Sequence, residues 1–175
     1  MHSSQGVLII AIITIALSVA LEKSEAVIFS TSLRAKGLSV ISTIDAARST
    51  VALSSKIKLL GVTLDGNINF NDQVKNVCRV SFFYIHALRH IRPSLTEEMS
   101  NVVACALFQS RVDYANSLYT GMSSVNFDKL QLAQNTLARI VTLTRKRDHI
   151  QPSLNRLHWL PIRQRVDFKV ALLTY

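Results

Sequence analysis

His86 and His90 have a spacing that can do chemistry, because two histidines four residues apart on a helix can share a metal ion. No carboxylate or cysteine is placed to complete a tetrahedral set, so we interpret the pair as part of a basic helix face. A hydrolase nucleophile needs a strained loop such as Gly-x-Ser-x-Gly, which is not found. Cys78 and Cys105 lie in apolar helical patterns and are expected to be buried free thiols.

The cationic side chains are the other group with chemical potential, and their chemistry is the binding of anions. The chain has 20 Lys and Arg against 11 Asp and Glu, which gives a net charge of +9 and a pI near 10. Of this charge, +7 lies after Phe70. The excess favours a polyanionic partner, and an ordinary solvated basic surface is the alternative.

The elements that must position these side chains are helices in the second part of the chain. Between 71 and 91, one set of residues recurs at helical spacing and predicts an amphipathic helix. Its inward residues are Val74, Val77, Cys78, Phe82, Ile85 and Leu88, and its outward residues are Lys75, Arg79, His86 and Arg89.

Further helices are predicted downstream. The capping-box sequence 94–97 predicts a second helix that runs to about Leu118 and is closed by Gly121. A third is expected from about 124 to 144, and the basic break TRKRDH follows it. A short helix then leads into a last helix that has Pro161 in its first turn and continues to Tyr175.

Trp159 lies at the junction before that last helix, in the sequence LHWLPIRQR. We expect it to pack in the core beside Leu157, Leu160 and Ile162 rather than to stack on a base. The junction is then a hydrophobic clamp that turns the chain between two helices. It leaves Arg163 and Arg165 outside.

Strands are predicted before Phe70. Residues 23–30 and 49–65 are rich in Val, Ile, Leu and Thr with alternation, and glycines punctuate the second segment. A Ser-rich connection that contains RAKG is expected between them as a loop or a hairpin-like excursion.

The N-terminal run GVLIIAIITIALSVAL, residues 6–21, is apolar except for Thr14 and Ser18. It is shorter than the ~20 residues that cross a bilayer untilted, and no Lys or Arg precedes it. A membrane segment, a signal sequence cleaved after Ala20 and a buried strand all fit this pattern. We expect a helix that projects from the bundle and associates weakly with membrane.

The predicted fold class is therefore α+β, mainly α, with an N-terminal apolar helix, a few strands and then a basic helical bundle. The expected organisation has three parts: an apolar N-terminal segment (1–21), a strand region (22–70) and a helical bundle with its connection (71–175).

Six segments together resemble the reverse transcriptase of non-LTR (LINE-type, jockey-like) retrotransposons. The resemblance covers residues 22–175 almost continuously and keeps the family's order. The segments are KSEAVIFS, IKLLGVTLD, FFYIHALRHIRPSLT, SRVDYANSLYTG, KLQLAQNTLARIVT and LHWLPIRQRVDFKVALLTY.

The resemblance implies that 22–70 is a palm remnant and that 71–175 is the thumb and its connection. Leu60 and Gly61 then correspond to the turn that grips the primer end, and a plain structural turn is the alternative for Gly61. Lys23 corresponds to the lysine that follows the palm helix and could contact the nucleic acid, and a solvated lysine at the start of a strand is the alternative. A thumb holds RNA or an RNA–DNA duplex by its backbone. Contact with phosphates, a solvated face and an intramolecular pair are the alternatives for Arg79, Arg89, Arg92, Arg111 and Arg139.

The chain departs from the family at the catalytic centre. In the family, aspartates upstream of the KSE strand hold two divalent metal ions, and this chain has no Asp-Asp dipeptide. We therefore expect a fragment without polymerase activity, cofactor or small-molecule substrate, intracellular like the family and binding nucleic acid weakly. A small membrane-associated protein that uses residues 6–21 and its basic domain, and a non-functional translated remnant, are the alternatives.

Overall fold

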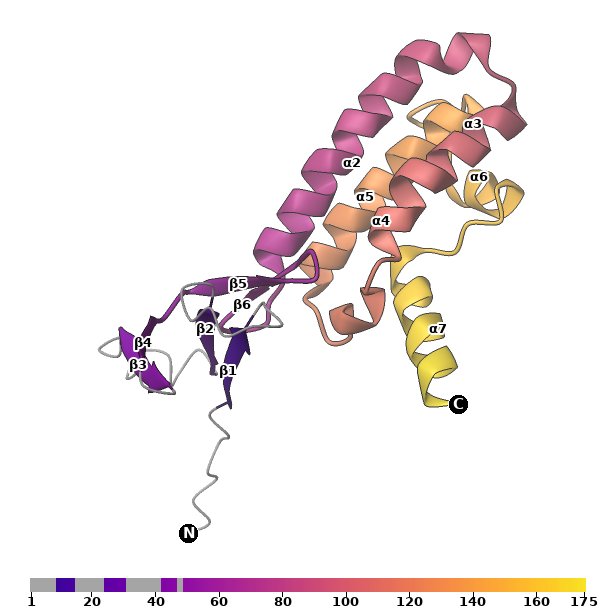
Figure 1. The fold of residues 1–175 in the computed structure, drawn as a ribbon. Helices are drawn as coiled ribbons and strands as arrows, with labels where there is room; N and C mark the ends of the chain where they lie inside the picture. The colour runs from indigo at the N-terminus through magenta and orange to yellow at the C-terminus, as the bar shows by residue number, and fades with distance from the viewer. Residues whose placement is uncertain (1–8, 15–23, 31–41, 47–48) are drawn as a thin grey trace. The chain divides into compact units, whose positions relative to one another are not determined.

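The computed structural model describes residues 9–14, 24–30, 42–46 and 49–175. The chain divides into two compact units, Met1–Asp72 and Gln73–Tyr175. Figure 1 shows strands in the first unit and helices in the second, so the structure is α+β and mainly α, as the sequence predicts.

The first unit contains three antiparallel two-stranded ladders in its described part. They pair β1 (Ile9–Thr14) with β2 (Ser24–Phe29), β3 (Thr43–Ala46) with β4 (Ser49–Ala52), and β5 (Lys56–Leu59) with β6 (Val62–Asp65). The strands predicted within 23–30 and 49–65 are therefore confirmed. RAKG lies outside the described residues.

The expected N-terminal helix is wrong for Ile9–Thr14, which is strand β1. It pairs with β2 from Ile9 opposite Phe29 to Thr14 opposite Ser24. Four of its six residues are isoleucine, and β-branched side chains favour strands over helices. The rest of the apolar run, 6–8 and 15–21, lies outside the described residues. Among the described helices, none combines the length and apolar character needed to cross a membrane.

Backbone contacts join β2 to the last ladder of this unit. The Ser30 amide donates to the Gly66 carbonyl at 2.9 Å. A Cβ at Gly66 would lie 2.8 Å from the Ile28 carbonyl oxygen, so the chains approach too closely there for any other residue. The buried apolar residues described in this unit are Ala26, Val27, Val51, Ile57, Val62 and Phe70.

The second unit is a helical bundle in which α5 is central. Figure 1 draws α5 between α2 and the α3–α4 segment, and α5 also packs against α6 and α7. The α-helices are α2 (Asn71–Ile91), α3 (Glu97–Ala104), α4 (Ser110–Val112), α5 (Ser124–Thr142), α6 (Gln151–Arg156) and α7 (Ile162–Thr174). Shorter turns link them: a 3₁₀ turn at Arg92–Ser94, a π-helical turn at Cys105–Gln109 and a 3₁₀ turn at Asn116–Tyr119.

The predicted second helix differs at both ends. Its N-cap is Thr96, whose Oγ1 accepts the Met99 amide at 3.2 Å, so the cap lies two residues after the start of the capping-box sequence. The helix ends at Val112 and not near Leu118, because Ala115 adopts a left-handed conformation with φ of 52°. The chain reaches the positive φ of Gly121 only after a further 3₁₀ turn.

Candidate nucleic-acid interface

The exposed side of α2 carries a continuous stripe of basic and aromatic side chains. Its opposite side buries Val74, Val77, Ile85 and Leu88, so the 3.6-residue period turns the polar positions to solvent. No Asp or Glu occurs from residue 73 to 96. We call this stripe the α2 outer face, and it consists of Lys75, Arg79, Phe83, His86, Arg89 and His90, all exposed.

The α2 outer face is long enough, and basic enough, to contact the phosphate backbone of a nucleic acid. From Lys75 to His90 it extends about 22 Å, at 1.5 Å per helical residue. Its cations can contact successive phosphates, and such contacts fix position without reading sequence. The prediction that Lys75, Arg79, His86 and Arg89 face outward is confirmed.

Phe83 is the member of this face that sequence reasoning missed. Its side chain is 69% exposed, and its ring meets the Tyr84 ring edge-on at 5.5 Å between centroids. Phe83 lies four residues after Arg79 and three before His86. This spacing places the three residues on one helix face, and the sequence could have indicated the exposure of Phe83 in this way. An aromatic ring among cations can stack on an unpaired base.

Arg79 and Arg111 are exposed and make local contacts. Arg79 Nη2 donates to Asn76 Oδ1 at 3.0 Å. Arg111, from α4, donates from Nη2 to the Tyr84 hydroxyl at 3.2 Å, and its guanidinium carbon is 5.2 Å from the centroid of that ring. Arg111 is therefore brought beside Tyr84 of α2, where Arg111 is exposed and Tyr84 is half-buried.

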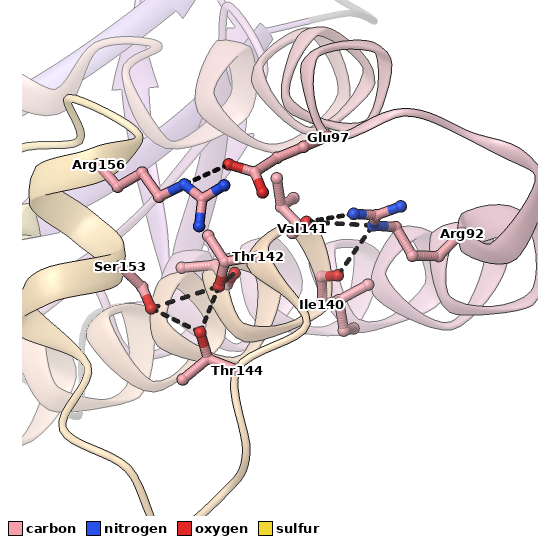
Figure 2. Close-up of polar contacts among 9 residues, drawn as sticks. Arg92, Glu97, Ile140, Val141, Thr142, Thr144, Ser153 and Arg156 are labelled. Atoms are coloured by element: carbon pink, nitrogen blue, oxygen red, sulfur yellow. Dashed lines mark hydrogen bonds and ion pairs between the residues drawn. The ribbon is translucent and has the colours of Figure 1, made fainter.

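Arg92 does not face outward but is buried and bonded within the protein, which is the intramolecular alternative for this residue. It is only 8% exposed. Its Nε donates to the carbonyls of Ile140 and Val141 at 3.2 and 3.1 Å, and Nη2 donates to Val141 at 2.8 Å. Nη1 donates to the Leu95 carbonyl at 2.7 Å. Figure 2 shows the guanidinium facing the C-terminal end of α5, where unpaired carbonyls and the helix dipole favour a cation.

Arg139 is half-buried and organises the turn that follows α5. Its Nη2 donates to the Asp148 carbonyl at 2.8 Å, and its Nη1 donates to the Arg145 carbonyl. These bonds hold the predicted basic break, in which Arg145, Lys146 and Arg147 are all exposed. Arg139 is thus engaged within the protein, which is the intramolecular alternative for this residue.

A cluster of hydroxyl groups also fixes the basic break. Thr142 Oγ1 is 2.7 Å from Thr144 Oγ1, which is 2.9 Å from Ser153 Oγ (Figure 2). Arg156 pairs with Glu97 at 2.7 Å in the same region. The backbone of this turn is therefore held by the helices on either side, and its basic side chains extend into solvent.

Trp159 is core, as predicted, with 4% of its surface exposed. Its Nε1 donates to Asn101 Oδ1 at 3.1 Å. In the amide orientation that satisfies both of its neighbours, Gln109 accepts from Trp159 Nε1 and from Arg165 Nη2, each at 3.0 Å. Leu160, expected beside Trp159 in the core, is instead 47% exposed.

The clamp interpretation expected Arg165 to lie outside, and this expectation is wrong. Its side chain is 12% exposed and pairs with Asp113, with 2.8 Å between Nη1 and Oδ2. Its Nε donates to the Leu160 carbonyl at 2.8 Å. Arg163 is exposed and lies over the Phe127 ring, 4.3 Å from the centroid. The junction is therefore fixed by polar bonds as well as by apolar packing.

Leu60 and Gly61 form the two-residue turn between β5 and β6. Leu59 pairs with Val62, and φ is 46° at Leu60 and 85° at Gly61, which is the pattern of a type I′ hairpin. Leu60 is 80% exposed at the tip. Lys23 lies outside the described residues.

The cysteines are free, as predicted, but half-buried rather than buried. Burial raises the pKa of the Cys78 thiol, and nearby Lys129 offsets part of this effect. Burial likewise raises the pKa of Cys105, against the effect of its hydrogen bond with Trp159. In the described part of the chain, no group of three or more His, Cys, Asp or Glu residues is placed to hold a metal ion.

Comparison with known proteins adds no relative. No protein-family profile matches the chain, and neither the curated proteins nor the solved structures contain a significant match.

Proposed function

We propose that residues 22–175 are the primer-grip, thumb and connection part of a non-LTR retrotransposon reverse transcriptase, and that this part binds primer–template duplex without sequence preference. The proposal rests on the six segments that resemble that family. The observation that carries the binding role is the α2 outer face, where Lys75, Arg79 and Arg89 lie on either side of an exposed Phe83 along the helix and no Asp or Glu occurs from 73 to 96. Such a face attracts a phosphate backbone and releases its counterions.

The exposed Leu60 at the hairpin tip supports the same assignment. A Leu at positive φ is disfavoured by its own backbone, and exposing it to water adds no burial energy. An exposed apolar residue in an unfavourable backbone conformation is typical of a residue that contacts a ligand. In this family, that ligand is the end of the primer.

We propose further that the chain does not polymerise. Phosphoryl transfer of this type requires carboxylates that hold two metal ions, and the chain lacks the family's Asp-Asp pair. The full chain should give no primer extension with Mg²⁺ or Mn²⁺ on any template. Metal-dependent incorporation that co-purifies with the chain through successive columns would contradict this.

The binding role is tested by two triple variants of equal charge. Lys75→Gln, Arg79→Gln and Arg89→Gln remove three charges from the α2 outer face, and Arg145→Gln, Lys146→Gln and Arg147→Gln remove three from the basic break. Both sets are exposed, and each lowers the net charge from +9 to +6. Affinity for a fluorescein-labelled RNA–DNA duplex is measured by anisotropy across a salt series.

The α2 variant should lower the slope of log affinity against log salt by about two to three, since each phosphate contact contributes roughly 0.9. The variant of the basic break should change the slope by less than one. Equal losses in both variants would show that net charge, and not the α2 outer face, is responsible.

A further inference from the structure

A second polar site lies in the helical unit, away from the α2 outer face. It is a pocket of about 390 Å³ between the end of the α3–α4 helix and α7. Its wall includes Asp113, Asn116, His158, Phe168 and Lys169. This volume is in the range of small-molecule sites.

Two hydrogen-bond acceptors in this wall have no partner. Asn116 is 3% exposed, and its Oδ1 makes no hydrogen bond. Asp113 Oδ2 is taken by Arg165, but Asp113 Oδ1 is buried and also makes no hydrogen bond. Buried polar atoms are nearly always paired in folded proteins, so two unpaired oxygens on residues that line one pocket point to a donor from outside the chain.

The charges of the pocket show what kind of donor fits. The carboxylate of Asp113 is already balanced by Arg165, and Lys169 adds an exposed positive charge. A cationic donor such as a guanidinium or an ammonium would be repelled by this net positive charge. A neutral N–H donor attached to an anion is favoured instead, because the anion can pair with Lys169.

The pocket also offers a flat apolar surface. Phe168 is 60% exposed, and Leu160 of the same wall is 47% exposed. Nucleotides combine a flat base, which can carry an amino group, with a phosphate on the sugar, and exposed aromatic side chains are where such bases stack.

We infer that this pocket binds one unpaired nucleotide whose base carries an exocyclic amine. The amine donates to Asp113 Oδ1 and Asn116 Oδ1, the ring stacks on Phe168, and the phosphate pairs with Lys169. Both acceptors lie beneath the pocket surface, so a side chain of the wall rotates to admit the base.

The geometry predicts selectivity between bases. Cytosine, adenine and guanine carry exocyclic amines, whereas uracil and thymine carry a carbonyl oxygen at position 4. In uracil or thymine, this carbonyl oxygen would face the two acceptor oxygens, and no hydrogen bond could form because none of the three oxygens carries a proton. Cytosine and uracil have nearly the same size, so comparing them isolates the amine.

The experiment measures anisotropy of fluorescein-labelled C8 and U8 RNA on the full chain. C8 should bind about tenfold more tightly than U8. Asn116→Leu, which removes one unpaired acceptor and keeps an apolar volume, should reduce this ratio to about one. Phe168→Ala should weaken both oligonucleotides by about tenfold.

Leu172→Ala is the matched control for Phe168→Ala. Leu172 is 61% exposed on the same helix but lies outside the pocket wall, so neither oligonucleotide should change. Phe168 is exposed, so its variant tests the pocket without disturbing the core. Competition by free CMP but not UMP would identify a pocket for free nucleotides, and competition by C8 alone would identify a pocket for a strand.

The nucleotide pocket rests on the proposed function in one respect, which is that nucleic acid supplies the nucleotide. The pocket and the duplex-binding role can nevertheless fail separately. Equal affinity for C8 and U8, or a ratio that Asn116→Leu leaves unchanged, would overturn the pocket even if duplex binding stands. A preference for C8 in a chain that does not bind duplex would support the pocket and overturn the proposed function.

Discussion

Arg92 links two helices through the carbonyls at the end of α5. Leu143 follows that helix with φ of 55°, and the Thr144 amide donates back to the Arg139 carbonyl at 3.1 Å, which is the Schellman arrangement. The carbonyls of Ile140 and Val141 are then bonded by the Arg92 guanidinium. One buried side chain therefore completes the cap.

We predict that Arg92→Met lowers the free energy of unfolding by about 2–4 kcal/mol, because it removes the donors to the carbonyls of Val141 and Leu95. Arg89→Met is the matched control: Arg89 is exposed on the last turn of α2, and its loss should change stability by about 0.5 kcal/mol or less. Urea denaturation followed by circular dichroism measures both. Equal stability of the two variants would mean that Arg92 is not a structural cap.

The two thiols should react slowly with alkylating agents near neutral pH. Burial raises the pKa of both Cys78 and Cys105, and the thiolate is the reactive form. The rate of reaction with iodoacetamide should reach half its maximum at a higher pH in the folded chain than in urea. Cys78→Ser and Cys105→Ser each report the remaining thiol, and a folded midpoint at or below the unfolded one would contradict the prediction.

The same pKa shift affects stability in a defined direction. A raised pKa means that the folded chain holds the thiol proton more tightly than the unfolded chain does. The resulting stability is complete below the ordinary thiol pKa and is lost as the pH rises through the raised value. The free energy of unfolding should therefore fall in that alkaline window, and less so in Cys78→Ser.

At the scale of elements, the β5–β6 hairpin is held in a turn that its sequence does not favour. Type I′ turns prefer Asn-Gly, and this turn has Leu60 before Gly61. We predict that Leu60→Asn stabilises the hairpin by about 1 kcal/mol, since Asn tolerates the left-handed conformation. Hydrogen exchange of the β5 and β6 amides should become slower.

Gly61→Ala is the opposing control for that variant. Its φ of 85° is unfavourable for any residue with a Cβ, so the same amides should exchange faster. If Leu60→Asn also sped exchange, apolar contacts of Leu60 would have to outweigh the strain of its backbone.

Helices with a long apolar period were predictable, and local exceptions were not. α2 begins and ends where its pattern predicts, at 71 and 91, because six turns of one period leave little freedom. The early end of the second helix depends on a left-handed Ala115, and alanine carries no signal for that conformation. The isoleucine run at β1 fits a helix or a strand, and its pairing with β2 decides between them.

The candidate site was predictable to the same extent. Arg79 and Arg89 lie inside the α2 period, so their exposure follows from it. Arg92 comes after that period ends and before Pro93, where no pattern sets the direction of a side chain. The pocket that contains Asn116 combines α7 with residues about 50 positions earlier in the chain, which no local pattern connects.

At the scale of the whole molecule, the first unit depends on pairing between segments that are far apart in sequence. β2 is bonded to β1 along its whole length. Ala26 of β2 also bonds to Ser54, and Ser30, which follows β2, bonds to Gly66. The second unit has its own core around α5. Changes at the N-terminus should therefore affect the strands of the first unit and leave the bundle intact.

Deletion of the N-terminal segment should change the solubility of the chain in opposite directions, depending on whether this segment is a strand or a membrane anchor. Deleting residues 1–21 removes β1 and leaves the β2 edge with unpaired amides and carbonyls, which template aggregation. The truncated chain should therefore be recovered less in the soluble fraction than the full chain. Deleting only residues 1–8 keeps β1 and should leave recovery unchanged. An increase in soluble chain without residues 1–21, with membrane association of the full chain, would show that the apolar run acts as an anchor instead of as the partner of β2.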